Sequence, residues 1–298
     1  MSVIAAMPSL EKTEDLSSPW RDIAVALTQT GGDAVAVEVA GGIAREYGAR
    51  LDVLQLVVMP APMIDAWAMV PDAGFAQVYT DLCDAAEVKA EALRKTIATL
   101  GVPGDVRTLE ALFVEPGRLA ASAARASDLI VMARPFDAPA DTAIVHAYFA
   151  TLLHETGRPI LVVPSSGLPL FPPHHAVLAW ADTAESARAL HDALPFLQRC
   201  ESVDVILVDP VATALEAREA RGNAVVRHLV EHGVAARVVS CKSRGKPVGA
   251  VLLDHARHSG AQLIVAGGYG HSKLREWVIG GTTRDLFLDA PVPVLFSH

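Results

Sequence analysis

The sequence predicts an α/β protein of two tandem domains, each an open, mostly parallel five-stranded sheet of the Rossmann type with helices on both faces. Short apolar runs alternate with longer amphipathic stretches along the chain, and this alternation favours a parallel sheet covered by helices. The same succession begins again in the middle of the chain. A proline-rich stretch at 164–173, typical of a domain linker, separates the two successions.

The length of 298 residues also favours two domains of about 150 residues each. We expect the first domain at 20–165 and the second at 174–298. Residues 1–19 lack the basic start and the long apolar core of a secretory signal. We therefore expect them to form a flexible leader.

Five apolar runs of strand length predict the sheet of the first domain. They lie at 23–27, 51–58, 106–112, 128–132 and 159–163. Apolar residues at helical spacing predict the helices between them. The first of these helices stops at Gly48, and the others cover 78–100, 116–126 and 147–155. The proline-bearing stretch from the second strand up to about residue 76 is expected to be an irregular connection.

The second domain repeats this order. Its expected strands lie at 176–180, 203–208, 235–240, 263–266 and 292–296, and its expected helices at 184–198, 217–232 and 247–258. Asp128 and Gln262 begin similar strands 134 positions apart, and Pro159 and Pro293 are separated by the same 134 positions. Equal offsets indicate equal lengths between these elements. The first strands are 152 positions apart, and the longer connection in the first domain absorbs the difference.

Composition excludes several classes of function. The formal net charge of −9 argues against direct DNA or RNA binding, which would need a basic face. The richest apolar window is interrupted by aspartate and proline, so no membrane span is indicated. Three cysteines, Cys83, Cys200 and Cys241, lie far apart, which fits a reduced compartment better than a disulfide framework. We therefore expect a cytoplasmic protein.

One stretch near the end of the sequence has the composition of an anion-binding loop. It follows the expected strand that ends at Ala266, and it contains two groups of small residues separated by nine others: Gly267, Gly268 and Gly270, then Gly280, Gly281, Thr282 and Thr283. Glycine tolerates unusual backbone angles and has no Cβ, so successive N–H groups can turn toward a phosphate. Thr282 and Asp285 resemble a capping box, which predicts a helix N-terminus with Thr282 as N-cap beside the same loop.

The spacing Gly267-x2-Gly270-x9-Gly280 resembles the G-x2-G-x9-G-[ST] loop of the universal stress protein superfamily. The resemblance covers nearly all of the chain after residue 20 and implies a tandem, adenine nucleotide alpha hydrolase-like fold. Nucleotide-binding members of the superfamily hold the phosphates of ATP or AMP in this loop. One position departs from the pattern, because Gly281 stands where a serine or threonine is expected. The loop matches neither a Walker loop nor a Rossmann glycine fingerprint.

The resemblance also implies an aspartate at the end of the first strand, near the adenine or ribose. Here the run is Trp-Ala-Asp-Thr, so that Ala181 occupies the expected position and the carboxylate comes one place later, at Asp182. Asp182 and Thr183 can equally be interpreted as an N-cap pair for the helix that follows.

Other polar residues can be interpreted either as ligand contacts or as parts of an exposed surface. His271, Ser272 and Lys273 lie between the glycine groups, where they either contact phosphate or form an exposed turn. Arg284, in the helix that follows, is a weaker candidate. Two histidine pairs, His228 with His232 and His255 with His258, share helix faces, and a solvated face is favoured over zinc because no cysteine or matched carboxylate accompanies them.

In the first domain the corresponding loop, 133–141, contains no glycine. Two prolines remove N–H donors, and Asp137 and Asp141 would repel phosphate. We therefore expect that this domain has lost its nucleotide site, and that changes at Arg134 or Asp137 leave nucleotide affinity unaltered.

Together these features predict a cytoplasmic stress-response protein whose second domain binds ATP or AMP, with or without Mg²⁺, as a regulatory ligand. A nucleotide-free interaction module, with both sites decayed, and a weak ATPase are the alternatives. No nucleophile with an evident base is visible. We also expect the final strands, 159–163 and 292–296, to pair and form an internal pseudo-dimer; pairing of whole chains through the outer helices stays open.

Overall fold

The computed structural model describes residues 19–58, 73–111, 114–135, 139–165, 169, 171–209, 215–268 and 281–298. Three predicted segments lie wholly or mostly outside these ranges. They are residues 1–18 of the expected leader, most of the connection after the second strand, and the middle of the glycine loop, residues 269–280.

The first half of the chain contains the predicted order of strands and helices. Its strands are β1 (Asp22–Ala26), β2 (Arg50–Val58), β3 (Gly104–Ala111), β4 (Leu129–Ala133) and β5 (Ile160–Val163). Its helices are α1 (Asp33–Tyr47), α2 (Ala73–Leu100), α3 (Pro116–Ala124) and α4 (Pro139–Glu155). As predicted, α1 ends at Gly48, which adopts the left-handed conformation with φ of 64°.

Two of these helices begin earlier than the sequence predicts. Helix α2 starts five residues before the expected position, at Ala73, and α4 starts eight residues before it, at Pro139. Proline is tolerated at the first position of a helix because that N–H has no partner inside the helix. Pro139, which the sequence places in a loop, is therefore the first residue of α4.

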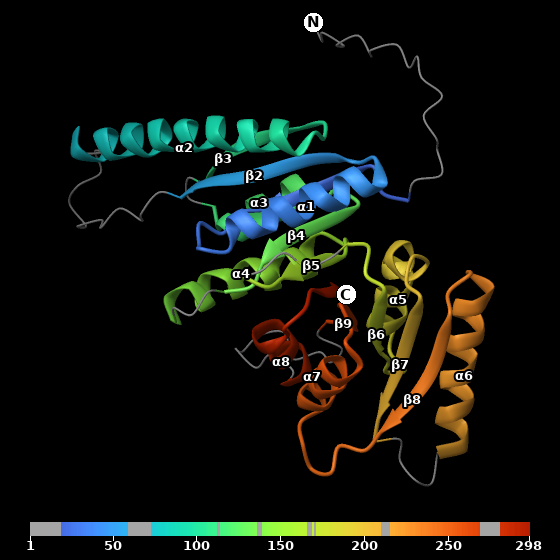
Figure 1. Ribbon diagram of the computed structural model, residues 1–298. Coiled ribbons are helices and arrows are strands. Elements are labelled where there is room, and N and C mark those ends of the chain that lie inside the picture. Colours follow the sequence, from blue (N-terminus) through green and yellow to red (C-terminus); the bar gives the residue numbers. More distant parts are fainter. Residues whose placement is uncertain are drawn as a thin grey trace, which may run out of the picture.

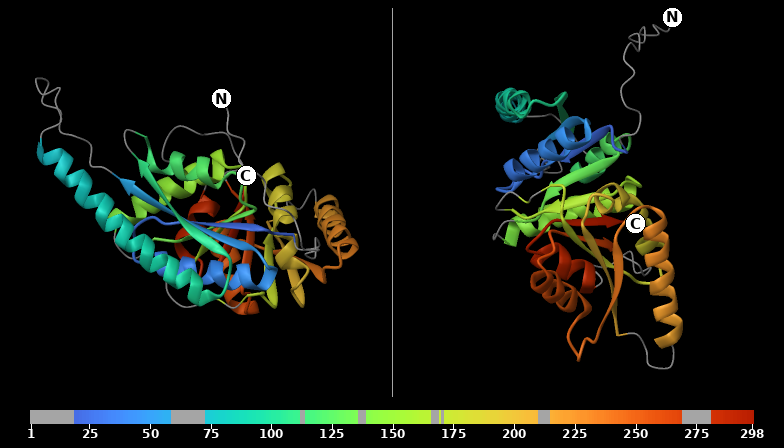
Figure 2. Two further views of the ribbon diagram at one scale, coloured as in Figure 1. Left: turned by 90° about the horizontal axis from the view of Figure 1, so that it is seen from above. Right: turned by 45° about the vertical axis from the view of Figure 1, so that its right-hand side comes forward.

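The second half repeats the arrangement. Its strands are β6 (His175–Ala179), β7 (Ser202–Val208), β8 (Ala236–Cys241), β9 (Leu263–Gly267) and β10 (Val294–Ser297). Its helices are α5 (Ala184–Leu197), α6 (Leu215–Glu231), α7 (Val248–Ser259) and α8 (Gly281–Asp289). Figures 1 and 2 show the two halves side by side.

All ten of these strands form one sheet in the order β3-β2-β1-β4-β5-β10-β9-β6-β7-β8. Pairs within each half are parallel, and the two halves meet through the antiparallel pair β5 and β10. The predicted fold class is therefore confirmed. Its two five-stranded sheets are continuous with one another.

The register of this junction matches the prediction that the final strands pair. Val162 lies opposite Val294, Leu161 opposite Leu295, and Ile160 opposite Phe296, and all of these side chains are buried. Pro159 and Pro293 precede the ladder and contribute only carbonyl oxygens, which accept hydrogen bonds from Ile130 and Ile264 (both 3.0 Å). Pairing thus covers two apolar strand edges that would otherwise invite aggregation.

Helices cover both faces of the sheet, and each face has a core that runs across both halves. Residues from α1, α2, α5 and α6 contribute to one core, and residues from α3, α4, α7 and α8 to the other. Alternation along a strand separates them, since Val131 and Val265 lie in the first core and Ile130 and Ile264 in the second.

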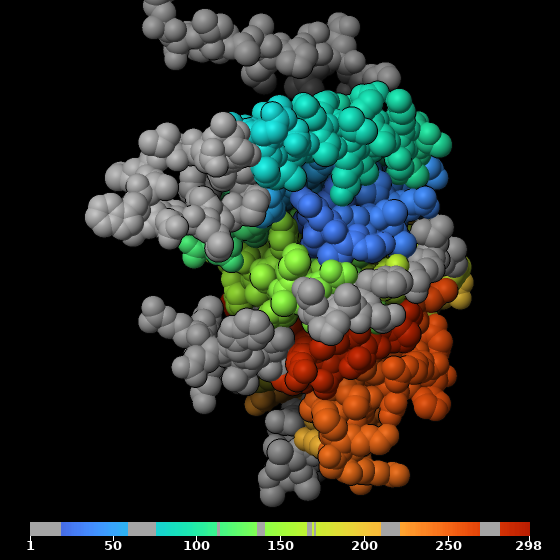
Figure 3. Space-filling view, turned by 90° about the vertical axis from the view of Figure 1, so that its left-hand side faces the viewer, coloured from blue at the N-terminus to red at the C-terminus, as the bar shows by residue number. Residues whose placement is uncertain are grey.

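Aromatic side chains join the halves on both faces. On one face the Phe149 ring of α4 stacks on Phe287 of α8, with centroids 4.6 Å apart. In the space-filling view, the light green surface of α4 borders the red surface of the C-terminal residues (Figure 3). On the other face the Trp20 ring lies 4.5 Å from that of Phe196, and the Tyr47 hydroxyl donates to the Pro195 carbonyl (2.8 Å). These contacts extend the strand junction into both helical layers.

Replacing Phe149 by alanine should therefore destabilise both halves together, by about 3–5 kcal/mol, because it leaves a cavity between α4 and α8. Urea unfolding followed by far-ultraviolet circular dichroism measures this. Val88→Ala, at a 74% exposed position of α2, is the control and should change the free energy of unfolding by less than about 0.5 kcal/mol. Two separate transitions in Phe149→Ala, with the second half unaffected, would contradict a shared core.

Candidate functional site

The carboxyl ends of β6 and β9 form the candidate site. These strands are neighbours, with Ala179 opposite Ala266. The chain order reverses between them, since β7 and β8 continue the sheet on one side and β10 on the other. In open α/β sheets, ligands bind in the crevice at such a switch point. The predicted site residues that lie in the described ranges approach this place from both strands.

The loop after β6 brings three predicted residues to this end of the sheet. Thr183 is the N-cap of α5, and its hydroxyl accepts a hydrogen bond from Ser186 N (3.3 Å). The backbone N–H of Ala181 donates to the Ser186 hydroxyl (3.3 Å). Thr183 therefore caps the helix, as one of the two interpretations predicted.

Asp182 does not cap α5. Its carboxylate, 65% exposed, accepts a hydrogen bond from the Arg221 guanidinium of α6. This ion pair has no signal in the sequence, because an arginine on a polar helix face is common and by itself indicates no partner. Asp182 thus presents a charged group beyond the carboxyl end of β6, together with a cation.

The end of β9 lies very close to the start of α5. A Cβ placed on Gly267 would be 2.7 Å from the backbone nitrogen of Ser186, so only glycine fits here without a shift. In the first half the same approach of strand to helix is made by Ala133, and the glycine is on the helix side, where a Cβ on Gly32 would be 2.5 Å from the Ala133 Cβ. Gly267 therefore has a packing role in addition to the predicted one.

Gly268 leads the chain away from the sheet and toward the first half. Its N–H donates to the Ser297 carbonyl (2.8 Å), and its carbonyl accepts from His298 Nδ1 (3.0 Å). A Cβ at this position would be 2.5 Å from Leu153 of α4. The predicted residues that follow lie outside the described ranges, namely Gly270, His271, Ser272, Lys273 and Gly280.

Helix α8 resumes the described chain at Gly281. The prediction that Thr282 is its N-cap is wrong, because the helix already includes Gly281. A hydroxyl followed by an acid three residues later marks a helix start only to within a residue or so. Thr282 and Thr283 thus lie in the first turn, and Thr283 is 5% exposed. Among the described residues, no atom lies within 4 Å of a Cβ placed on Gly281.

The corresponding strand end of the first half contains a carboxylate of the protein itself. Asp33, 9% exposed, accepts hydrogen bonds from Thr28 N (3.0 Å) and Gln29 N (2.9 Å). Burial raises the pKa of Asp33, and these hydrogen bonds and the nearby Lys89 ammonium offset only part of that effect. Asp33 thus occupies the N–H donors at the end of β1.

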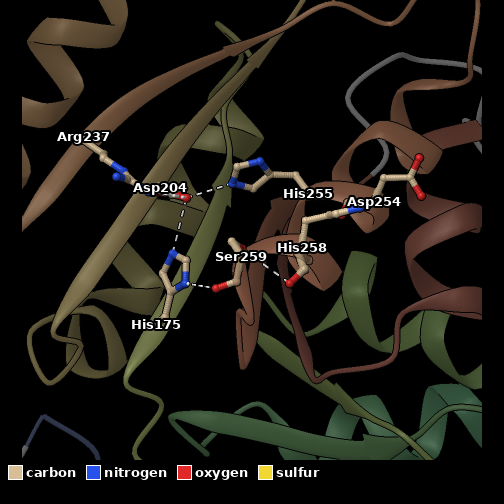
Figure 4. Close-up of polar contacts among 8 residues, drawn as sticks. His175, Asp204, Arg237, Asp254, His255, His258 and Ser259 are labelled. Atoms are coloured by element: carbon tan, nitrogen blue, oxygen red, sulfur yellow. Dashed lines mark hydrogen bonds and ion pairs between the residues drawn. The ribbon is translucent and has the colours of Figure 1, made fainter.

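A second polar cluster lies at the opposite, amino end of the sheet of the second half (Figure 4). Asp204 of β7 is fully buried, and its carboxylate accepts hydrogen bonds from Arg237 Nε (2.6 Å) and His255 Nε2 (2.8 Å). His175 Nε2 lies 3.4 Å from the same carboxylate. The two histidines at 255 and 258 therefore have different partners, since His258 Nδ1 donates to the Asp254 carbonyl of its own helix (2.6 Å).

The other histidine pair has a third member. The ring of His191, on α5, lies 5.1 Å from that of His228, which in turn lies 4.6 Å from that of His232. Burial, with the neighbouring rings of His232 and His191, lowers the pKa of His228. Within the described ranges, no three side chains of histidine, cysteine, aspartate or glutamate are arranged to hold a metal ion. The three rings pack against one another between α5 and the end of α6.

The fold and the crevice define a tandem α/β protein with a Rossmann-like sheet in each half. Residues 173–298 match the model of the universal stress protein family. Over these residues the chain is similar to the universal stress protein family, and the chain as a whole consists of two similar α/β halves joined in one sheet.

Solved structures extend the likeness of fold over nearly the whole chain. A universal stress protein from Archaeoglobus fulgidus has a TM-score of 0.74 and 14% identity, with 93% of this chain and 95% of that chain covered. A putative universal stress protein from Pseudomonas aeruginosa has a TM-score of 0.57 and 16% identity, with 94% of each chain covered. No curated protein matches the sequence.

In the part of the chain that the structure describes, no helix is both long enough and apolar enough to cross a bilayer.

The Asp204 cluster should make stability depend on pH. Burial alone would raise the pKa of Asp204, but the hydrogen bonds from Arg237 and His255 outweigh it and hold the pKa below the ordinary value of 3.8. Ionised Asp204 therefore stabilises the fold above that ordinary value, and the contribution is lost as the pH falls through the folded-state pKa. Asp204→Asn should lower the free energy of unfolding at pH 7 by about 1–3 kcal/mol.

The difference between wild type and Asp204→Asn should narrow as the pH falls below the ordinary pKa of 3.8. Urea titrations at a series of pH values measure it. Asp254→Asn, which removes an exposed partner of Lys246, is the control and should have little effect. An Asp204→Asn deficit that is constant from neutral to acidic pH would contradict a role for the ionised carboxylate.

Proposed function

We propose that this protein is a cytoplasmic universal stress protein that binds an adenine nucleotide, ATP or AMP, at the carboxyl ends of β6 and β9. The nucleotide acts as a regulatory ligand in a stress response. The observation that carries the proposal is the spacing Gly267-x2-Gly270-x9-Gly280, whose first glycine ends β9 and whose last glycine directly precedes α8. The proposal includes a leader at 1–19, a first domain at 20–165 and a second domain at 174–298.

The described flanks of the glycine loop fit a phosphate group. Among the described residues, no atom lies within 4 Å of a Cβ placed on Gly281 at the start of α8, and the N–H groups of a helix start, together with the helix dipole, favour an anion. In the proposed site the phosphates lie between this helix start and the backbone of Gly268 and Gly270. His271 and Ser272 supply side-chain contacts to the same phosphates, and Mg²⁺ accompanies ATP through its phosphate oxygens.

The other side of the crevice supplies the contacts to the nucleoside. Asp182 is exposed at the end of β6 and carries a carboxylate that can accept hydrogen bonds from ribose hydroxyls. The same carboxylate pairs with the Arg221 guanidinium. Ala181, Thr183 and Ala266 form the backbone and small side chains around it, so that a planar base can approach the strand ends.

A nucleotide-free interaction module is the second candidate. It is favoured by Gly281 in place of the expected hydroxyl residue and by Ala181 in place of the expected aspartate. Slow ATP hydrolysis is a third outcome, because positioned phosphates with a metal ion can suffice for weak turnover. Acid extraction of the purified protein, followed by chromatography of any released nucleotide, separates the first two candidates.

Gly270→Val should abolish binding of ATP and AMP without loss of the fold, since its side chain fills space intended for phosphate and donates no hydrogen bond. Isothermal titration calorimetry measures the affinity, and circular dichroism monitors the fold. Gly42→Val is the matched control, because a Cβ on Gly42 of α1 meets no atom within 4 Å. Unchanged affinity in Gly270→Val would mean that the glycine loop serves only the structure.

The chain should bind one nucleotide, not two. In the first half the Asp33 carboxylate accepts the N–H groups of Thr28 and Gln29 at the end of β1, and the segment after β4, where the second half has its glycine loop, contains prolines and no glycine. Calorimetric stoichiometry, checked by equilibrium dialysis, should therefore give about one nucleotide per chain at saturation, because only the second half has the glycine loop that is proposed to bind phosphate. A value near two would show that the first half retains a working site.

A further inference from the structure

We propose that the first half of the chain positions the phosphate-binding helix of the second half, and that Arg134 is the residue that does so. This inference rests on the proposed function, because it concerns the site at the carboxyl end of β9. It assigns a role to the half that has no nucleotide of its own. The sequence predicted the opposite, namely that Arg134 is unimportant for binding.

Arg134 follows β4 directly and reaches into the second half. Its guanidinium Nη1 donates to the carbonyl oxygens of Ala290 (2.7 Å) and Leu288 (3.2 Å), at the end of α8. The last carbonyls of a helix have no partner inside it, and a cation there also interacts favourably with the helix dipole. Arg134 therefore holds the far end of the helix whose first turn borders the candidate phosphate site.

Helix α8 has a second attachment to the first half along its side. Phe287 is 1% exposed, and its ring stacks on Phe149 of α4 with an interplanar angle of 27°. The ring of His146, also on α4, lies 5.9 Å from that of Phe287. A helix fixed both at its end and along its side can neither slide nor rotate freely.

The strand side of the glycine loop is attached to the same helix of the first half. Gly268 lies against Leu153, and His298, which donates to the Gly268 carbonyl, has its ring 4.3 Å from that of His154. Residues 153 and 154 belong to α4, as does Phe149. The described residues that precede and follow positions 269–280 are thus both in contact with α4 of the first half.

Arg134 and Gly268 occupy equivalent positions in the two halves. They are 134 positions apart, as are the landmark strands. The Arg134 N–H donates to the Val163 carbonyl (2.9 Å), and the Gly268 N–H donates to the carbonyl of Ser297, the equivalent residue (2.8 Å). The backbone is therefore the same, but one half has a glycine that opens a loop and the other an arginine that supports its neighbour.

The test uses three variants of the full chain. Arg134→Gln removes the charge, and Arg134→Lys keeps a cation that can still reach a carbonyl. Arg45→Gln is the matched control, since Arg45 Nε donates to the last carbonyl of α2, Leu100 (3.1 Å), far from α8. Calorimetry gives affinities for ATP, AMP and adenosine, and hydrogen–deuterium exchange without ligand reports on residues 281–289.

We expect faster exchange in α8 of Arg134→Gln and binding of ATP and AMP weakened by about three- to tenfold, the size of a partly buried helix-end contact. Adenosine affinity should be unchanged, because only phosphate meets the start of α8. Arg134→Lys should restore most of the ATP affinity, and Arg45→Gln should behave as wild type.

Three results would overturn the inference. They are α8 exchange in Arg134→Gln no faster than in Arg45→Gln, faster exchange with unaltered ATP affinity, and equal losses for ATP and adenosine, which would indicate general destabilisation. Failure of wild type to bind any nucleotide would overturn the proposed function and, with it, the role of Arg134 in binding. The exchange measurement would still decide by itself whether Arg134 anchors α8.

Discussion

The antiparallel pairing of β5 with β10 is the interaction on which the rest of the structure depends. Each strand is short and apolar, and each would be an exposed edge in an isolated half. Their pairing makes one sheet of ten strands and relates the halves by an approximate two-fold rotation. That relation brings α4 against α8 on one face and α1 against α5 on the other. The Arg134 contact with the end of α8 follows from the same geometry.

The two halves have equal backbones but different polar residues at the strand ends. In the first half Asp33 takes the N–H donors next to β1, and Arg134 is committed to the neighbouring half. In the second half the equivalent of Arg134 is Gly268, which lies in the glycine-rich stretch. A tandem chain can thus assign ligand binding to one copy and support to the other, which a symmetric dimer of identical chains cannot do.

The sequence predicted what depends on local patterns. Apolar periodicity located the strands, and the repeat at 134 positions identified equivalent elements and the pairing of the final strands. It did not predict contacts between residues far apart, such as Arg134 with Ala290, 156 positions away. One available signal was missed: Asp204 interrupts an apolar strand, and a carboxylate buried in a sheet requires charged or hydrogen-bonding partners. The middle of the candidate site, 269–280, lies outside the described ranges.

The antiparallel junction also decides what a binding partner would encounter. Because the strands of the two halves run in opposite directions across it, each long rim of the molecule combines the carboxyl ends of one half with the amino ends of the other. The rim that includes Asp182 and Gly267 therefore carries the amino ends of β4 and β5, and Arg134 is on the opposite rim. A protein that recognises the proposed nucleotide-bearing rim would touch both halves at once, whereas the opposite rim has Arg134 at the position equivalent to Gly268. The two halves thus have similar backbones, but the two rims of the molecule carry different side chains.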